Sequence, residues 1–281
     1  MFEFPEMVGF PLANWVDNTM SWLLTHLDGF FDIVGLIILN VVVGIEQIFL
    51  NIPWFVIVLL AGFAGWKLIG KLRTGIVFMV LMLLIGSFGY WELAMRTLSL
   101  VIASVFFSLI IGLPLGISMA RNDRTESILK PLLDGMQTMP SFVYLIPALM
   151  FFGMGKVPAM FATIIYAVPP VIRLTNVGIR TVDKEAVEAA KAFGATRNQV
   201  LFDVQLPLAK PSIMVGVNQT TMMALSMVVI GSMIGAKGLG MEVLLAINRI
   251  EVGRGFEAGL SIVFLAIIID RITYSFSQKK K

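Results

Sequence analysis

The sequence predicts an all-α protein, a polytopic bundle of helices embedded in a membrane. Charged residues make up only 14% of the 281 residues and hydrophobic residues 58%, whereas a soluble domain carries about 25% charged residues. A chain this poor in charge cannot cover a water-facing surface, so the bilayer is its natural solvent. Apolar runs of bilayer length and an uneven placement of the basic residues support the same fold class.

About seven apolar runs are long enough, or nearly so, to cross the membrane. A hydrocarbon core roughly 30 Å thick needs about 20 apolar residues in a helix. The run at 139–153 is the weakest, because it is short and contains Pro140 and Pro147. The predicted spans are residues 53–70, 75–91, 97–120, 139–153, 157–174, 211–234 and 256–273.

The N-terminal segment, residues 1–52, is predicted to lie on the membrane as interfacial helices, ahead of a transmembrane domain at 53–281. Its apolar run 33–50 contains Asn40, Glu46 and Gln47. A carboxylate at the centre of a bilayer costs several kcal/mol, which favours an interfacial position. The alternative is that 33–50 is an eighth span.

The basic residues predict the orientation of the chain. With the N-terminus outside and seven spans, all but five of the 21 Lys and Arg residues fall in inner loops, as the positive-inside rule requires. No Lys or Arg precedes Lys67. The five on the outer side are Arg96, Lys156, Lys237, Arg249 and Arg254.

The longest inner loop contains a predicted helix, tight turn and second helix at 180–207. Asp183 is placed to cap the first helix, and Gly194 to end it in the left-handed conformation. Thr196 and Gln199 have capping-box spacing for the second helix, which Pro207 is expected to stop. One face of the first helix consists mainly of small side chains, since Ala186, Ala189, Ala190 and Phe193 fall on it at helical spacing.

The pattern alone leaves two interpretations of this loop equally open: a docking surface for a soluble partner, or an ordinary hairpin without one. Polar residues in the predicted span 211–234 leave a similar choice. They line a translocation path, or they form hydrogen bonds between helices. These residues are Asn218, Gln219, Thr220, Thr221 and Ser226.

The inner loop resembles the EAA loop of ABC importer permeases. Glu188-Ala189-Ala190 is followed after three residues by Gly194, and then by Leu206-Pro207 at the family's spacing, with Val204 in place of isoleucine. The resemblance implies the ABC type I importer permease fold and a loop that docks on a separate ATPase. In that loop Glu188 would make polar contacts, Ala189 and Ala190 would allow close packing, and Gly194, Ala195 and Thr196 would form the turn.

Residues 53–275 resemble the glycine betaine/proline betaine permeases in particular, through 112–117, 131–140 and 216–220. The resemblance implies a bacterial inner-membrane permease homodimer that imports a small osmoprotectant. Its partners would be an extracellular substrate-binding protein and ATPase subunits that bind ATP and Mg. Choline, carnitine and proline are alternative substrates.

Other function classes find little support. There is no GxxxxGK[ST] phosphate loop, so the chain is not expected to hydrolyse ATP. Without cysteine and with His26 as the one histidine, no metal site is expected. The basic residues follow topology, which argues against nucleic-acid binding. An ion-coupled secondary transporter is the less favoured alternative, because it usually needs ionisable residues at the membrane midplane.

Overall fold

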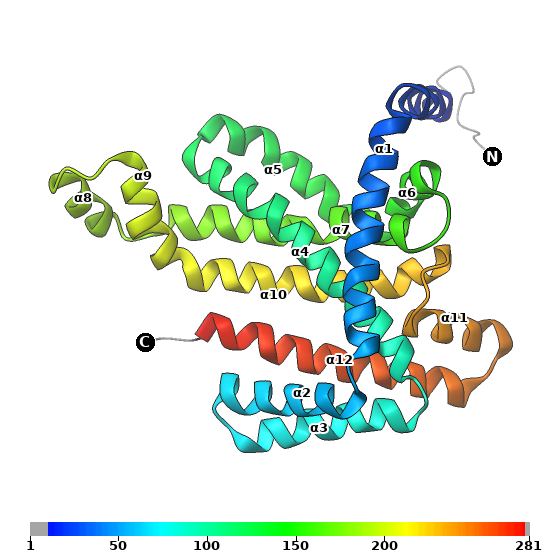
Figure 1. The fold of residues 1–281 in the computed structure, drawn as a ribbon. Coiled ribbons are helices and arrows are strands. Elements are labelled where there is room, and N and C mark those ends of the chain that lie inside the picture. Colours follow the sequence, from blue (N-terminus) through cyan, green and yellow to red (C-terminus); the bar gives the residue numbers. More distant parts are fainter. Residues whose placement is uncertain (1–10, 279–281) are drawn as a thin grey trace, which may run out of the picture.

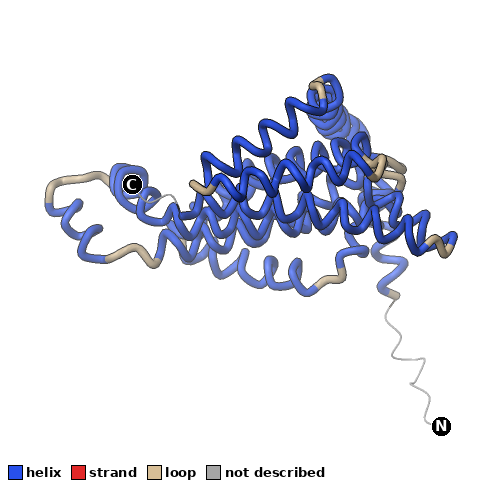
Figure 2. Tube along the Cα trace, turned by 90° about the horizontal axis from the view of Figure 1, so that it is seen from below, coloured by secondary structure: helices blue, strands red, loops and turns tan. Residues whose placement is uncertain are grey.

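A computed structural model describes residues 11–278, which form helices and short loops and contain no strand. Figure 2 shows that the loops lie mainly at the two ends of the bundle. The predicted all-α class is therefore confirmed. The helices are α1 (Leu12–Asn51), α2 (Trp54–Ile69), α3 (Leu72–Ser87), α4 (Trp91–Arg121), α5 (Asp123–Thr138), η2 (Ser141–Tyr144), α6 (Leu145–Phe152), α7 (Lys156–Arg180), α8 (Lys184–Ala192), α9 (Arg197–Gln199), η3 (Val200–Gln205), α10 (Leu206–Ile230), η4 (Gly231–Ile234), α11 (Leu239–Arg249) and α12 (Val252–Gln278).

Five described helices are long and apolar enough to cross a membrane: α1, α4, α7, the continuous helix Arg197–Ile234 and α12. The predicted spans at 97–120, 157–174, 211–234 and 256–273 lie within the last four. The spans expected at 53–70 and 75–91 are the 16-residue helices α2 and α3, each about 24 Å long at 1.5 Å per residue.

The expected span at 139–153 is a broken segment. It consists of the short helices η2 and α6, which bend by 109° from α5. Helix α5 ends before Pro140, because proline lacks the N–H that would continue the helix. Pro140 itself has an extended backbone and is followed by η2. Counted with α5 as one bent span, this segment brings the number of candidate spans to six.

Helix α1 covers most of the predicted interfacial segment; residues 1–10 of that segment lie outside the described residues. It is 40 residues long, with a kink at Leu27. By length and composition it qualifies as a span, yet after the kink it runs across α7, α10 and α12 at a steep angle (Figure 1). Its interfacial placement stays a prediction.

The central layer of the bundle is α4, α7 and α10, which approach one another through glycines. A Cβ added at Gly112 or Gly116 of α4 would lie 2.4 Å from Val171 Cγ1 or 2.6 Å from Thr175 Cβ of α7. Gly178 of α7 meets α10 in the same way. Small residues of this kind let membrane helices pack backbone to backbone.

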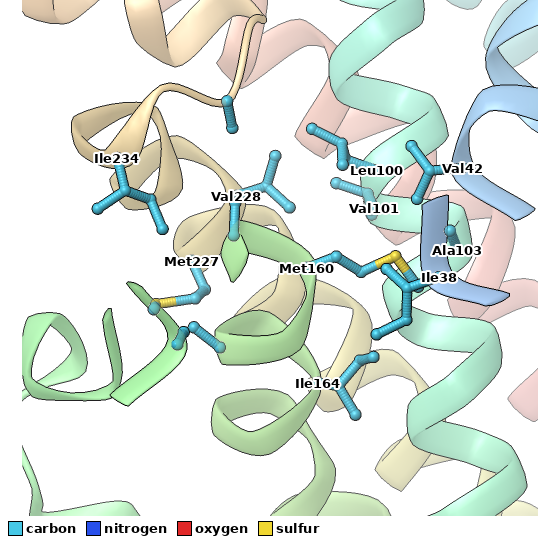
Figure 3. Packing of buried hydrophobic residues seen from close by; sticks show 14 of the residues in the cluster. Ile38, Val42, Leu100, Val101, Ala103, Met160, Ile164, Met227, Val228 and Ile234 are labelled. Atoms are coloured by element: carbon cyan, nitrogen blue, oxygen red, sulfur yellow. The ribbon is translucent and has the colours of Figure 1, made fainter. Parts of the chain in front are cut away.

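The outer half of this layer is closed by an apolar core. Figure 3 shows side chains from α1, α4, α7 and α10 meeting there. Val42, Ala103 and Met160 are completely buried. Since α1 contributes Ile38 and Val42 to this core, the N-terminal helix is part of the packed structure.

A buried ion cluster joins α1 to α4 and α7. Glu46 is only 6% exposed. Its carboxylate lies 2.5 Å from Lys156 Nζ and 3.0 Å from Arg96 Nη1, and Arg96 also contacts Glu92 at 2.5 Å. In the sequence, Glu46 was the argument against a membrane span at 33–50; in the structure, its two cationic partners compensate for the solvation that the carboxylate loses.

Candidate functional site

Helices α8 and α9 form a hairpin at one end of the bundle, beyond α7 and α10 (Figure 1). The carboxyl end of α12 and the turn between α2 and α3 lie at the same end. The basic residues of the predicted inner loops therefore gather on one side, as the charge pattern indicated. We call residues 184–199 the coupling hairpin.

The predicted caps of the coupling hairpin are confirmed. The Asp183 side chain accepts a hydrogen bond from the backbone N–H of Glu185 at 2.9 Å. Thr196 and Gln199 form a reciprocal capping box. These bonds satisfy backbone donors at both helix starts, so the hairpin keeps a defined shape although it is exposed.

Gly194 ends α8 as the sequence predicts. Its φ is +82°, and its N–H donates to Lys191 O at 2.9 Å, while the Ala195 N–H donates to Ala190 O at 3.1 Å. This pair of bonds is the Schellman motif, which places a left-handed residue after the helix. Glycine adopts that conformation without the strain of a side chain.

Pro207 does not stop the second helix, and this prediction is wrong. The chain runs from Arg197 to Ile234 as one continuous helix. Residues Val200–Gln205 are π-helical, and the Leu206 N–H donates to Leu201 O, five residues back. This wider turn relieves the clash that a proline makes with the fourth preceding carbonyl.

Most of the coupling hairpin is exposed, and it presents a bare aromatic ring. Phe193, directly before the turn, is 93% exposed. Glu188, Ala189, Gly194 and Thr196 are also exposed; Ala190 and Ala195 are half-buried. Leu206 and Pro207 lie at the base, where α10 begins. The turn therefore holds its aromatic ring away from the bundle, among small and polar residues.

Two arginines that sequence reasoning counted only as topology signals make contacts where α4 and α7 end, next to the hairpin. Arg121, the last residue of α4, donates to Asn198 Oδ1 at 3.2 Å. Arg180, the last residue of α7, contacts Asp123 at 2.7 Å and Glu126 at 3.0 Å. The sequence offered no sign of these pairs, because the partners come from distant helices.

We expect Arg180→Ala to loosen the end of α7 from α4 and α5. Arg180 also donates to Met119 O at 2.8 Å and to Asn176 at 3.0 Å, so the variant leaves several acceptors at the α4–α5 junction unpaired. Losing such a network costs about 1–3 kcal/mol. Thermal unfolding should show a lower Tm; Arg124→Ala, on the neighbouring surface, is the control and should leave Tm unchanged. Equal Tm values for both variants would contradict this role.

The five polar candidates in α10 face different ways. Asn218 donates to Asp270 Oδ1 of α12 at 3.0 Å and accepts from Thr273. Thr220 and Thr221 are buried, and Thr221 bonds to Val217 O within its own helix. Gln219 and Ser226, separated by two helical turns, are exposed on the open side of α10.

A cavity of about 520 Å³ is lined by residues of α2, α4 and α12. Its walls are apolar except for Thr221 and Thr273, and both hydroxyls are already bonded within the protein. A carboxylate would find no free hydrogen-bond donor there, and an unpaired charge in such a site is very costly. The cavity is therefore a poor site for a solute carboxylate.

Within residues 11–278, no group of three or more His, Asp or Glu side chains is placed to hold a metal ion. A stack of apolar helices, a polar hairpin at one end and a polar strip, formed by Gln219 and Ser226 on the open face of α10, together define a membrane-embedded transport subunit. The chain belongs to the family of binding-protein-dependent transport system inner membrane components, whose model matches residues 112–281.

Relatives from three bacteria match nearly the whole chain. The glycine betaine/carnitine transport permease protein GbuB of Listeria monocytogenes is 49% identical over 99% of both chains. The glycine betaine/proline betaine transport system permease protein ProW of Escherichia coli is 45% identical over 96% of this chain and 76% of its own length. OpuAB of Bacillus subtilis, a glycine betaine transport system permease protein, is 43% identical over 96% of both.

Solved structures of the MetNI methionine ABC transporter in inward-facing conformations share the fold. One chain covers 66% of this protein and 95% of its own length, with a TM-score of 0.59 and 21% identity. A second covers 64% and 89%, with a TM-score of 0.55 and 22% identity. The predicted ABC type I importer permease fold is confirmed.

Proposed function

We propose that this chain is the permease subunit of an ATP-driven importer of glycine betaine or a related quaternary-amine osmoprotectant. The observation that carries the proposal is the rigid, exposed coupling hairpin with Phe193 at its turn, in a chain whose relatives are named as glycine betaine permeases over almost their full lengths. Choline, carnitine or proline as substrate are the alternatives within the same class.

The working assembly we propose has two copies of this chain, two ATPase subunits and an extracellular substrate-binding protein. ATP and Mg bind to the ATPase subunits, and this chain performs no catalytic step of its own. When nucleotide closes the ATPase pair, each docked hairpin moves with it. Because α8 and α9 connect directly to α7 and α10, that motion reaches the bundle.

The test of docking is Phe193→Ala. Since the ring is 93% exposed, its loss should leave folding unchanged, while removal of a buried interface aromatic costs about 2 kcal/mol or more. We expect association with the ATPase to weaken by more than about tenfold and ATP-driven uptake of labelled betaine to fall. Phe276→Ala, at the inner end of α12, is the control. Unchanged association of the Phe193 variant would refute docking through this turn.

The polar strip on α10 is the part of the path that we propose contacts solute, and it gives a paired prediction. Gln219→Leu should raise the KM of uptake, because an exposed amide is lost without disturbing packing. Asn218→Leu should instead lower Tm by removing the hydrogen bonds that Asn218 makes with Asp270 and Thr273 of α12, at about 1–3 kcal/mol. Uptake kinetics and thermal unfolding of the two variants distinguish a residue that contacts solute from one that holds helices together. A stable, fully active Gln219 variant would exclude this residue from the path.

An ion-coupled secondary transporter is the competing function. Uptake driven by Na⁺ or H⁺ gradients in liposomes that contain this chain alone would favour it. The described spans offer little for ion coupling, since Glu46 is neutralised by Lys156 and Arg96 and Asp270 is engaged by Asn218.

A further inference from the structure

Behind the coupling hairpin lies a hollow of about 570 Å³ that the docking of Phe193 does not use. Its floor is aliphatic, with Val200 and Leu201 4% and 2% exposed. Three basic side chains, each from a different helix, and two amide side chains surround this floor. The full lining is Arg121, Asn122, Val187, Lys191, Arg197, Val200, Leu201 and Gln205; we call it the basic hollow.

The basic hollow has cations but no carboxylate in its lining. Other basic residues that brace the bundle are paired: Arg96 and Lys156 with Glu46, and Arg180 with Asp123 and Glu126. Within residues 11–278, by contrast, Arg121, Lys191 and Arg197 form no ion pair, although all three are exposed around one space. Three like charges that share a hollow repel one another unless an anion enters.

The hollow is also held in shape. The Arg121 side chain is held by its hydrogen bond to Asn198. The backbone of Lys191 is fixed by the Schellman turn that follows it, and that of Arg197 by the capping box in which α9 starts. The π-helix η3 supplies the floor, because its wider turn sets Val200, Leu201 and Gln205 along one wall. The backbone positions that carry the three cations are therefore set before any partner arrives, which lowers the cost of binding.

We propose that the basic hollow receives an acidic segment of the ATPase subunit, as a second contact beside Phe193. This rests on the proposed function, which brings an ATPase to the same end of the bundle. A carboxylate on a short aliphatic stem matches both features of the site, since the stem covers the aliphatic floor and the oxygens meet Arg121 or Arg197 in paired hydrogen bonds. The volume accommodates several residues, more than one small ion would fill.

Zero-length carbodiimide coupling tests the chemistry of the occupant. In the assembled complex, the amine of Lys191 should form an amide with an Asp or Glu side chain of the ATPase, identified by peptide mass spectrometry. Lys71, exposed at the same end of the bundle in the α2–α3 turn, should give no such product. A product joining Lys191 to a second copy of this chain, or no product in an intact complex, would overturn the proposal.

Charge reversal tests the contribution to docking. With the protein in neutral-lipid nanodiscs, we expect Lys191→Glu with Arg197→Glu to raise the Kd for the ATPase by roughly tenfold or more and to flatten its dependence on salt. Lys71→Glu is the matched control. A double variant that behaves like the control overturns this inference alone. If wild-type protein binds no ATPase, the proposed function fails with it. If the reversal matters only in nanodiscs with anionic lipid, a lipid headgroup is the occupant and the proposal is wrong.

Discussion

Gly194→Pro should abolish ATP-driven uptake while the protein still inserts and folds. Proline fixes φ near −65°, whereas Gly194 has φ +82°, and it lacks the N–H that Gly194 donates to Lys191 O. The Schellman turn therefore cannot form, and α8 loses its angle to α9. Betaine uptake by proteoliposomes with the ATPase and binding protein measures the effect.

Two further substitutions separate the turn's shape from general damage. Gly194→Asn should retain much of the uptake, because asparagine enters the left-handed region more easily than other residues with a side chain. Gly70 has φ +78° and open space around it, as Gly194 does, but ends α2 away from the hairpin. Gly194→Ala and Gly70→Ala carry the same strain of about 1–2 kcal/mol. We expect only the first to reduce uptake by as much as tenfold; equal effects would disprove a special role for the hairpin.

Glu46→Ala should produce a large loss of stability. It leaves Lys156 and Arg96 without their shared carboxylate in a region where their side chains are only 20% and 22% exposed. Removing one partner of a buried ion pair costs about 3–5 kcal/mol. Because both cations retain some solvent contact, we expect about 3 kcal/mol, measured as a fall in Tm of the purified protein in detergent or nanodiscs.

The control for this cluster is Glu92→Ala. Glu92 contacts the same Arg96 at 2.5 Å but is 63% exposed, and exposed pairs contribute less than about 1 kcal/mol. Glu46→Gln tests whether charge or shape matters, since the amide keeps the volume and leaves the cations unneutralised. If Glu46→Ala and Glu92→Ala lower Tm equally, α1 is not held by this cluster.

Whether a feature of this protein could be predicted from the sequence depends on how far apart in the chain the interacting residues lie. Caps and turns were predictable, because Asp183, Thr196 and Gly194 act on residues within a few positions of themselves. The prediction that Pro207 ends the second helix was wrong, because a π-helical turn accommodates the proline and no local signal for that turn is evident. The break at 139–153 was predicted only in part. Pro140 and Pro147 indicated an interrupted helix, but the 109° bend of this segment from α5 depends on packing.

The candidate site shows the same division. The spacing from Glu188 to Pro207 located the coupling hairpin, yet the exposure of Phe193 and the clustering of Arg121, Lys191 and Arg197 around one hollow appear only in the folded chain. Among the polar residues of α10, the sequence could not separate Asn218, which bonds α12, from Gln219, which faces outward. Which side of a helix meets a neighbour is decided by tertiary packing.

By itself the sequence determined that this protein is a helical membrane bundle with its basic loops on one side and a capped hairpin among them. Composition, hydrophobic run length and short-range hydrogen bonding fix those features, because each depends on solvent or on near neighbours. The tertiary structure decided the rest: that Glu46 is buried against cations from α4 and α7, that α1 lies across the bundle, and that three cations share a hollow. Those features join residues far apart in the chain, and only the packed helices bring them together.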